Sequence, residues 1–227
     1  YFSEHLQLQG VLTLEALYYV AVVVLEVPSG YLSDRYGRRR TLIASSCLLV
    51  ASYSLFVLAN SFAAFAVAQV GLAGGIAFQS GTGTSFHFDS LAATGRGEEY
   101  EEREGIVTRN SLAATAGAAI LGGAAAAWNL RLAYLLSATA AVGALALTVS
   151  FREPEAVEED DPSGFFLQLR AVLGQLRRPA LAWLFAYAVA MTILNHVPYE
   201  FYQPYLKIAG RQWGLAQNAP FATGLHM

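Results

Sequence analysis

Residues 30–40 read GYLSDRYGRRR, which places one aspartate and four arginines in a stretch of eleven residues. Apolar segments flank it on both sides: residues 14–29 read LEALYYVAVVVLEVPS, and residues 41–59 read TLIASSCLLVASYSLFVLA. A charged side chain inside a bilayer is costly, so charges gather where a chain leaves the lipid. The pattern predicts two membrane-spanning helices joined by a short charged turn at the membrane surface.

The composition of the whole chain supports this interpretation. Of the 227 residues, 55% are hydrophobic and only 14% are charged, whereas soluble globular proteins carry about 25% charged residues. A helix needs about 20 apolar residues to cross a bilayer, and six runs are candidates: residues 12–32, 41–59, 62–86, 106–128, 132–151 and 180–200. Backbone polar groups in lipid must bond within their own segment, so these runs are expected to be helices. The predicted fold class is an all-α integral membrane protein with six transmembrane helices.

Several classes of function are disfavoured by the sequence. The net charge of −3 speaks against a nucleic-acid partner, which requires a basic surface. Cys47 is the single cysteine and therefore forms no internal disulfide. Gly81-Thr-Gly83-Thr lacks the lysine of a phosphate loop, and the chain has no nucleophile elbow. Neither a cofactor nor a metal site is predicted.

The basic residues divide unevenly between the two sides of the predicted membrane. Three of the fourteen fall on one side, namely Arg131, Lys207 and Arg211. The other side holds the rest: Arg35, Arg38, Arg39, Arg40, Arg96, Arg103, Arg109, Arg152, Arg170, Arg177 and Arg178. Because cytoplasmic loops carry the excess of basic residues, the GYLSDRYGRRR turn is expected to be cytoplasmic.

Two longer polar stretches separate some of the spans. Residues 95–105 read GRGEEYEEREG, and residues 152–178 begin with a second acidic run. The acidic residues of both stretches, 98–104 and 153–161, are interpreted as solvated charge. The apolar and polar residues mixed in 165–178 indicate either an amphipathic helix at the membrane surface or the beginning of the sixth span.

The charged turn resembles the signature of the major facilitator superfamily. The pattern G-x-x-x-D-R/K-x-G-R/K-R/K between the second and third helices of that family is matched at every fixed position, by Gly30, Asp34, Arg35, Gly37, Arg38 and Arg39. The preceding Glu26-Val-Pro28-Ser-Gly30 resembles the E-x-P-T/S-G variant of one bacterial branch. The resemblance covers the whole chain and implies that its six spans are helices two to seven of a twelve-helix bundle.

The resemblance also implies a domain organisation and a function. Residues 1–151 would be the N-terminal half without its first helix, 152–178 the cytoplasmic linker with its amphipathic helix, and 179–227 the start of the C-terminal half. The expected protein is a secondary active transporter that moves a small organic solute by alternating access. It is expected in the bacterial inner membrane, as a monomer when full length.

Members of the family use the charged loop as a latch between the two halves in the outward-facing state. The resemblance implies that Asp34 is the latch acid, that Arg38 is its partner, and that Gly30 and Gly37 permit a close approach and a tight turn. A purely topological role of these charges is the alternative interpretation. The residues assigned to the latch are Gly30, Asp34, Arg35, Gly37, Arg38, Arg39, Asp89 and Arg109.

Asp89 enters this set because Phe88-Asp89-Ser90-Leu91 resembles a Y-D-S-L stretch of the same branch. Its carboxylate is expected to accept from Arg38 or Arg109, and a solvated aspartate at a helix end is the alternative. The neighbouring His87 is interpreted as structural.

Polar residues within the spans are candidates for the path of the solute or of protons. In the family the seventh helix lines the central cavity, so the last span contributes most of them; the set is Glu26, Gln69, Asn195, His196, Glu200 and Gln203. An interfacial belt is the alternative for the aromatic residues of that span. Two potential ligands on one helix are too few to predict a metal site.

Two departures from the family pattern leave both proton coupling and the direction of transport open. Gln69 stands near the place where many proton-coupled members have an arginine, and residues 117–123, GAAILGG, lack the proline of the antiporter signature. Proton-coupled efflux is the leading hypothesis, and uptake by symport or a non-transporting scaffold are the alternatives. Small residues, including Gly71, Gly75 and most of 113–127, are expected to let helices pack closely.

Overall fold

A computed structural model of the chain describes residues 6–154 and, beyond them, 170, 174–175, 178–187, 190–191 and 194. Five long helices follow one another in the first of these ranges: α2 (Leu8–Tyr36), α3 (Arg38–Leu58), α4 (Phe62–Ala93), α5 (Tyr100–Trp128) and α6 (Leu130–Ser150). A single 3-10 turn, η1 (Gly97–Glu99), precedes α5. Each long helix contains a stretch that is long and apolar enough to cross a membrane. Five of the six predicted spans are therefore confirmed as helices. Of the sixth, 180–200, the structure describes residues 180–187, 190, 191 and 194, and these are helical.

Side chains in two of the short connections accept hydrogen bonds from free backbone N–H groups at the start of the next helix. The Ser61 hydroxyl accepts from the backbone N–H of Ala64 at the start of α4. The Asn129 side chain accepts from the N–H of Arg131 at 2.9 Å at the start of α6. Both residues are typical N-caps, since their short oxygens reach a free N–H of the first turn. The chain therefore turns within residues 59–61 between α3 and α4, and at Asn129 alone between α5 and α6.

The predicted boundaries are wrong at the connection between α4 and α5. The polar stretch 95–105 is only half a loop, because α4 continues to Ala93 and α5 already begins at Tyr100. The first turn of α5 contains Glu101 and Glu102. Carboxylates at a helix N-terminus interact favourably with the helix dipole, so these acids favour helix rather than loop.

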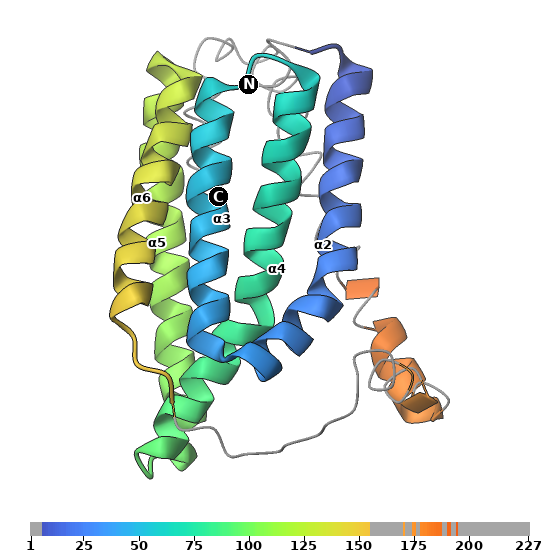
Figure 1. Ribbon diagram of the computed structural model, residues 1–227, viewed down its shortest axis with the longest axis vertical. Helices are drawn as coiled ribbons and strands as arrows, with labels where there is room; N and C mark the ends of the chain where they lie inside the picture. Colours follow the sequence, from blue (N-terminus) through green and yellow to red (C-terminus); the bar gives the residue numbers. More distant parts are fainter. Residues whose placement is uncertain are drawn as a thin grey trace, which may run out of the picture.

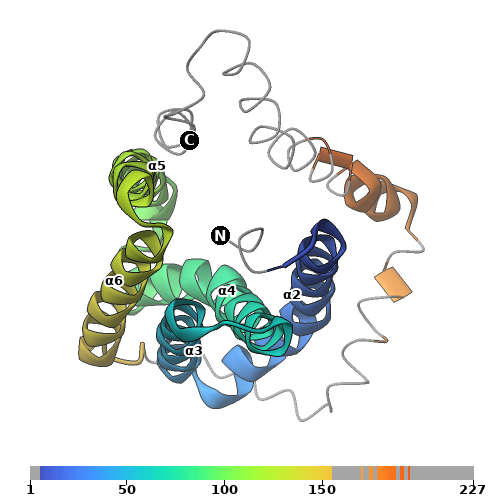
Figure 2. The same ribbon diagram turned by 90° about the horizontal axis from the view of Figure 1, so that it is seen from above.

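The helices are nearly parallel or antiparallel, with α4 at the centre of the bundle (Figure 1; Figure 2). The helix α4 packs against α2 and α3, α3 packs against α6, and α5 lies beside α6. The lower part of α2 bends toward α3 (Figure 1). Pro28 lies inside α2, and a proline within a helix removes one backbone hydrogen bond.

Tight packing between α3 and α4 depends on glycine. A Cβ atom added at Gly75 would lie 2.6 Å from Leu49 Cδ2 and 3.3 Å from the Ser45 carbonyl oxygen. The Ser45 hydroxyl donates to the Gly75 carbonyl at 2.6 Å. The close approach predicted at Gly71 and Gly75 is confirmed. In α5, by contrast, the space around Gly117 and Gly122 is open among the described residues.

Candidate functional site

The charged stretch 30–40 is helical except at one residue. The helix α2 continues to Tyr36, α3 begins at Arg38, and Gly37 alone connects them with a φ of +96°. The predicted loop is therefore shorter than expected, because glycine tolerates a positive φ that lets one residue reverse the chain. We call this end of the bundle the Gly37 end. A Cβ atom added at Gly30 would have no neighbour within 4 Å, so the expected close approach there is not seen among the described residues.

Arg38 joins three helices at the Gly37 end. Its Nη1 lies 3.0 Å from Asp34 Oδ1 on the last turns of α2, and its Nε donates to Asp89 Oδ2 near the end of α4. The side chain of Asp34 is 70% exposed, whereas those of Arg38 and Asp89 are 24% and 29% exposed. The Arg38–Asp89 pair is thus the more sheltered one, and water weakens the Arg38–Asp34 pair more strongly. We call Asp34, Arg38 and Asp89 the Arg38 cluster.

Two of the other three arginines assigned to the latch, Arg35 and Arg109, have partners outside the Arg38 cluster. Arg35 Nη1 donates to the Tyr31 hydroxyl at 2.5 Å, and this hydrogen bond raises the pKa of the guanidinium above its ordinary value. Arg109 Nη2 donates to the Asn110 side-chain oxygen at 3.4 Å. Of the two partners expected for Asp89, the structure therefore brings Arg38 to it and leaves Arg109 apart.

Glu153 is a member of the site that the sequence analysis missed. Its carboxylate accepts from the backbone N–H of Arg38 at 2.6 Å and from that of Arg39 at 3.0 Å. The Arg39 guanidinium in turn donates to the Val149 carbonyl at 2.7 Å, near the end of α6. Glu153 is exposed, as expected of solvated charge, but it has a structural partner that the sequence did not indicate, because the free N–H groups and positive dipole at the start of α3 attract a carboxylate.

This contact also explains why residue 37 is glycine. A Cβ atom at Gly37 would lie 3.1 Å from the carboxyl group of Glu153, and the backbone there has a positive φ. Both the conformation and the space favour glycine. The turn, the first residues of α3 and the residues after α6 therefore form one connected arrangement.

Other acidic residues interpreted as solvated also have partners. Glu99 accepts from Arg96 and Arg103, at 2.7 Å and 2.8 Å. Glu104 Oε2 lies 2.6 Å from His87 Nδ1, across from α5 to α4. Glu104 is more than solvated charge, because α5 begins early enough to place it beside His87 of α4. Glu99 remains 42% exposed and is solvated as well as paired.

Two of the residues proposed for a solute or proton path are described. Glu26 lies in the part of α2 that can span the membrane, and its carboxylate accepts from the Ser80 hydroxyl of α4 at 3.3 Å. The adjacent Ser29 hydroxyl donates to the carbonyl oxygens of Glu26 and Ala77. Gln69 is 4% exposed and so is enclosed between helices rather than placed on an open path. The remaining four, Asn195, His196, Glu200 and Gln203, lie outside the described residues.

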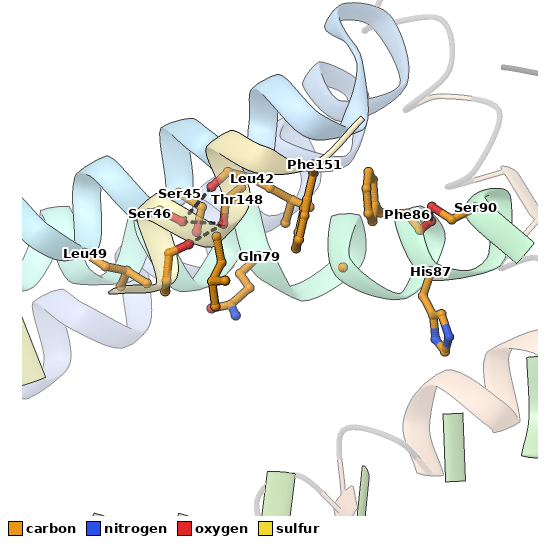
Figure 3. Close-up of a pocket in the computed structure, with 13 residues that line it drawn as sticks. Leu42, Ser45, Ser46, Leu49, Gln79, Phe86, His87, Ser90, Thr148 and Phe151 are labelled. Atoms are coloured by element: carbon orange, nitrogen blue, oxygen red, sulfur yellow. Dashed lines mark hydrogen bonds between the residues drawn. The ribbon is translucent and has the colours of Figure 1, made fainter. Parts of the chain in front are cut away.

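A pocket of about 410 Å³ lies between α3, α4 and α6 (Figure 3). The hydroxyls of Ser45, Ser46 and Thr148 gather in one part of it, and the rings of Phe86 and Phe151 stack at 5.1 Å in another. Each of these hydroxyls already donates to a backbone carbonyl. The pocket therefore offers a mainly apolar surface. Within the described ranges, no group of three His, Cys, Asp or Glu side chains is arranged to hold a metal ion.

Comparison with known proteins identifies the sequence with one family. The model of the family described as Major Facilitator Superfamily matches residues 2–227. Searches of curated proteins and of solved structures give no match.

Proposed function

Because the chain belongs to the Major Facilitator Superfamily and is thus an integral membrane protein of a secondary transporter family, we propose that it moves a small organic solute by alternating access. We further propose that the solute leaves the cell in exchange for protons, and that the Gly37 end faces the cytoplasm. The excess of basic residues on that side supports the orientation.

The observation that carries this proposal is the Arg38 cluster. One guanidinium contacts carboxylates from α2 and α4, and it stands on the first residue of α3. A rocking movement of helix bundles needs contacts that form in one state and break in the other. Partly exposed ion pairs suit this role, because their low net strength of about 0–1 kcal/mol lets them break readily.

Glu26 supports coupling to protons. Its carboxyl group lies within a span and, among the residues that the structure describes, forms a hydrogen bond only with a neutral hydroxyl, that of Ser80. An acid at membrane depth is costly when charged and therefore usually faces a water-filled cavity or takes up a proton. We propose Glu26, with Glu200 of the last span, as the proton carriers.

Flux measurements in membrane vesicles test the proposal. Vesicles containing the full-length protein are given a proton gradient and a fluorescent lipophilic amine, and Arg38→Gln and Asp34→Asn are compared with the wild type. Both variants should lose most of the flux while still inserting into the membrane. Arg40→Gln is the matched control, since Arg40 is an exposed arginine of the same turn that forms no ion pair among the described residues.

The results separate the alternatives. If the solute moves across the membrane in the same direction as the protons, uptake by symport is favoured over efflux. Flux that is equal in the wild type, Arg38→Gln and Arg40→Gln proteins would show that the cluster only sets topology. No proton-dependent flux for any of a panel of cationic, anionic and neutral solutes would favour the scaffold.

A further inference from the structure

His87 and Glu104 connect two helices that otherwise share little side-chain contact. His87 Nδ1 of α4 lies 2.6 Å from Glu104 Oε2 of α5, and both side chains are largely sheltered, with 25% and 29% exposed. In the described part of the chain this is the one side-chain hydrogen bond between α4 and α5. The helix α5 packs mainly against α6 and has no buried residue among those described. The pair therefore contributes a large share of the attachment of α5 to α4.

Aromatic rings hold the imidazole in place. The ring of Tyr100, the first residue of α5, lies 5.5 Å from that of His87, and it also makes an edge contact with Phe88. Figure 3 shows His87 extending from α4 away from the hydroxyl groups of Ser45, Ser46 and Thr148. The imidazole is thus directed toward the start of α5 rather than toward the centre of the pocket.

Glu104 is the acid available to a charged His87. On α4, Asp89 is engaged by Arg38, and on α5, Arg103 is engaged by Glu99 of η1, which also binds Arg96. Tyr100 is the other ionisable group in contact with the imidazole. The residues that α3 and α6 contribute to the pocket beside His87 are Leu42, Ser45, Ser46, Leu49, Ala144, Leu147, Thr148 and Phe151, none of which is ionisable.

We propose that His87 and Glu104 form a proton-binding site that controls how firmly α5 is attached to α4. A proton from water at the Gly37 end adds to the free nitrogen of the neutral ring, and the resulting imidazolium faces the Glu104 carboxylate. Histidine is the side chain that changes charge between about pH 5 and 8. The Glu104 carboxylate already forms a hydrogen bond with the neutral ring, and protonation adds the attraction between two opposite charges. Acidification therefore tightens the link and alkaline conditions loosen it.

The consequence for transport rests on the proposed function. If the helices of this half rearrange during alternating access, a tighter α4–α5 link slows the transport cycle when the pH at the Gly37 end is low. The site would then report the pH of that compartment. It differs from the proton carrier proposed at Glu26, because the pair lies near the helix ends and need not contact the solute.

Hydrogen exchange tests the site without any solute. Exchange of η1 and the first turns of α5 is measured in the full-length protein in lipid nanodiscs, at about pH 5.5 and about pH 8, and corrected for the intrinsic pH dependence of amides. We expect this segment to exchange up to about fivefold more slowly at the lower pH in the wild type, as for the gain of one partly exposed ion pair. His87→Gln, which keeps a hydrogen-bond donor but cannot be charged, and Glu104→Gln should both abolish the difference.

Glu102→Gln is the matched control, since it removes the same charge from the same helix without touching His87 and should keep the wild-type difference. A wild-type segment that exchanges equally at both pH values would overturn the proposal. So would a difference that survives in His87→Gln or Glu104→Gln. Because exchange is read without flux, failure here leaves the transport proposal standing, and failure of the Arg38→Gln flux test leaves the proton site standing.

Discussion

Replacing Glu153 by alanine tests the contact that joins the start of α3 to the residues after α6. In the native structure the Glu153 carboxylate accepts from two backbone N–H groups, those of Arg38 and Arg39. These N–H groups belong to the first turn of α3 and have no partner within the helix. Without the carboxylate they are left to water, and the first turn of α3 should fray.

The magnitude follows from the number and exposure of these bonds. Replacing a side chain that satisfies helix N-terminal N–H groups by alanine costs about 0.5–2 kcal/mol, and the charge adds about 0.3–1 kcal/mol through the helix dipole. Glu153 is exposed, so water screens its charge. We expect Glu153→Ala to lower the free energy of unfolding by about 1 kcal/mol. Glu153→Gln retains one acceptor oxygen and should lose about half as much.

Two measurements check this expectation in the full-length protein in detergent. Thermal unfolding gives the overall loss of stability, and hydrogen exchange locates it. Exchange should accelerate about fivefold in the first turn of α3, which corresponds to about 1 kcal/mol, and stay unchanged at the Leu58 end of the helix. Glu102→Ala on α5 is the matched control. If the first turn of α3 keeps its protection in Glu153→Ala, or if Glu102→Ala affects it equally, the carboxylate does not hold this helix end.

Two further substitutions probe the contacts between α3 and α4. Asp89→Asn leaves Arg38 with one ion pair, that with Asp34. We expect the free energy of unfolding to fall by about 1 kcal/mol and the flux to decrease. Unchanged stability and flux would show that Asp89 is not part of the latch. Gly75→Ala places a Cβ atom 2.6 Å from Leu49 Cδ2 and should cost about 1–3 kcal/mol through overpacking. Gly81→Ala on the same helix, where the space is open, should be neutral or stabilising by up to about 1 kcal/mol because alanine favours helix; equal effects of the two changes would contradict this account of the packing.

The helices and their turns could be predicted because each is determined by a local pattern. An apolar run of the right length predicts a span, and Ser61 or Asn129 predicts the start of the next helix. The Asp34–Arg38 contact could also be predicted from a local pattern, since residues four apart lie on one face of a helix. The two side chains are in contact even though Gly37 separates their helices. The prediction for residues 95–105 was wrong for a local reason. Their many charges indicated a loop, although glutamates also favour the first turn of a helix.

Partners distant in the sequence were beyond the reach of such patterns. Glu153 lies 115 residues after Arg38, and only the packing of α6 against α3 brings it to the end of α3. The partner of Asp89 is a second example. The sequence was compatible with both Arg38 and Arg109, and only the packing of the helices selects Arg38. Since α4 packs closely against α3 and meets α5 mainly near η1, Asp89 faces the start of α3. The close packing of α4 against α3 therefore decides which arginine Asp89 meets.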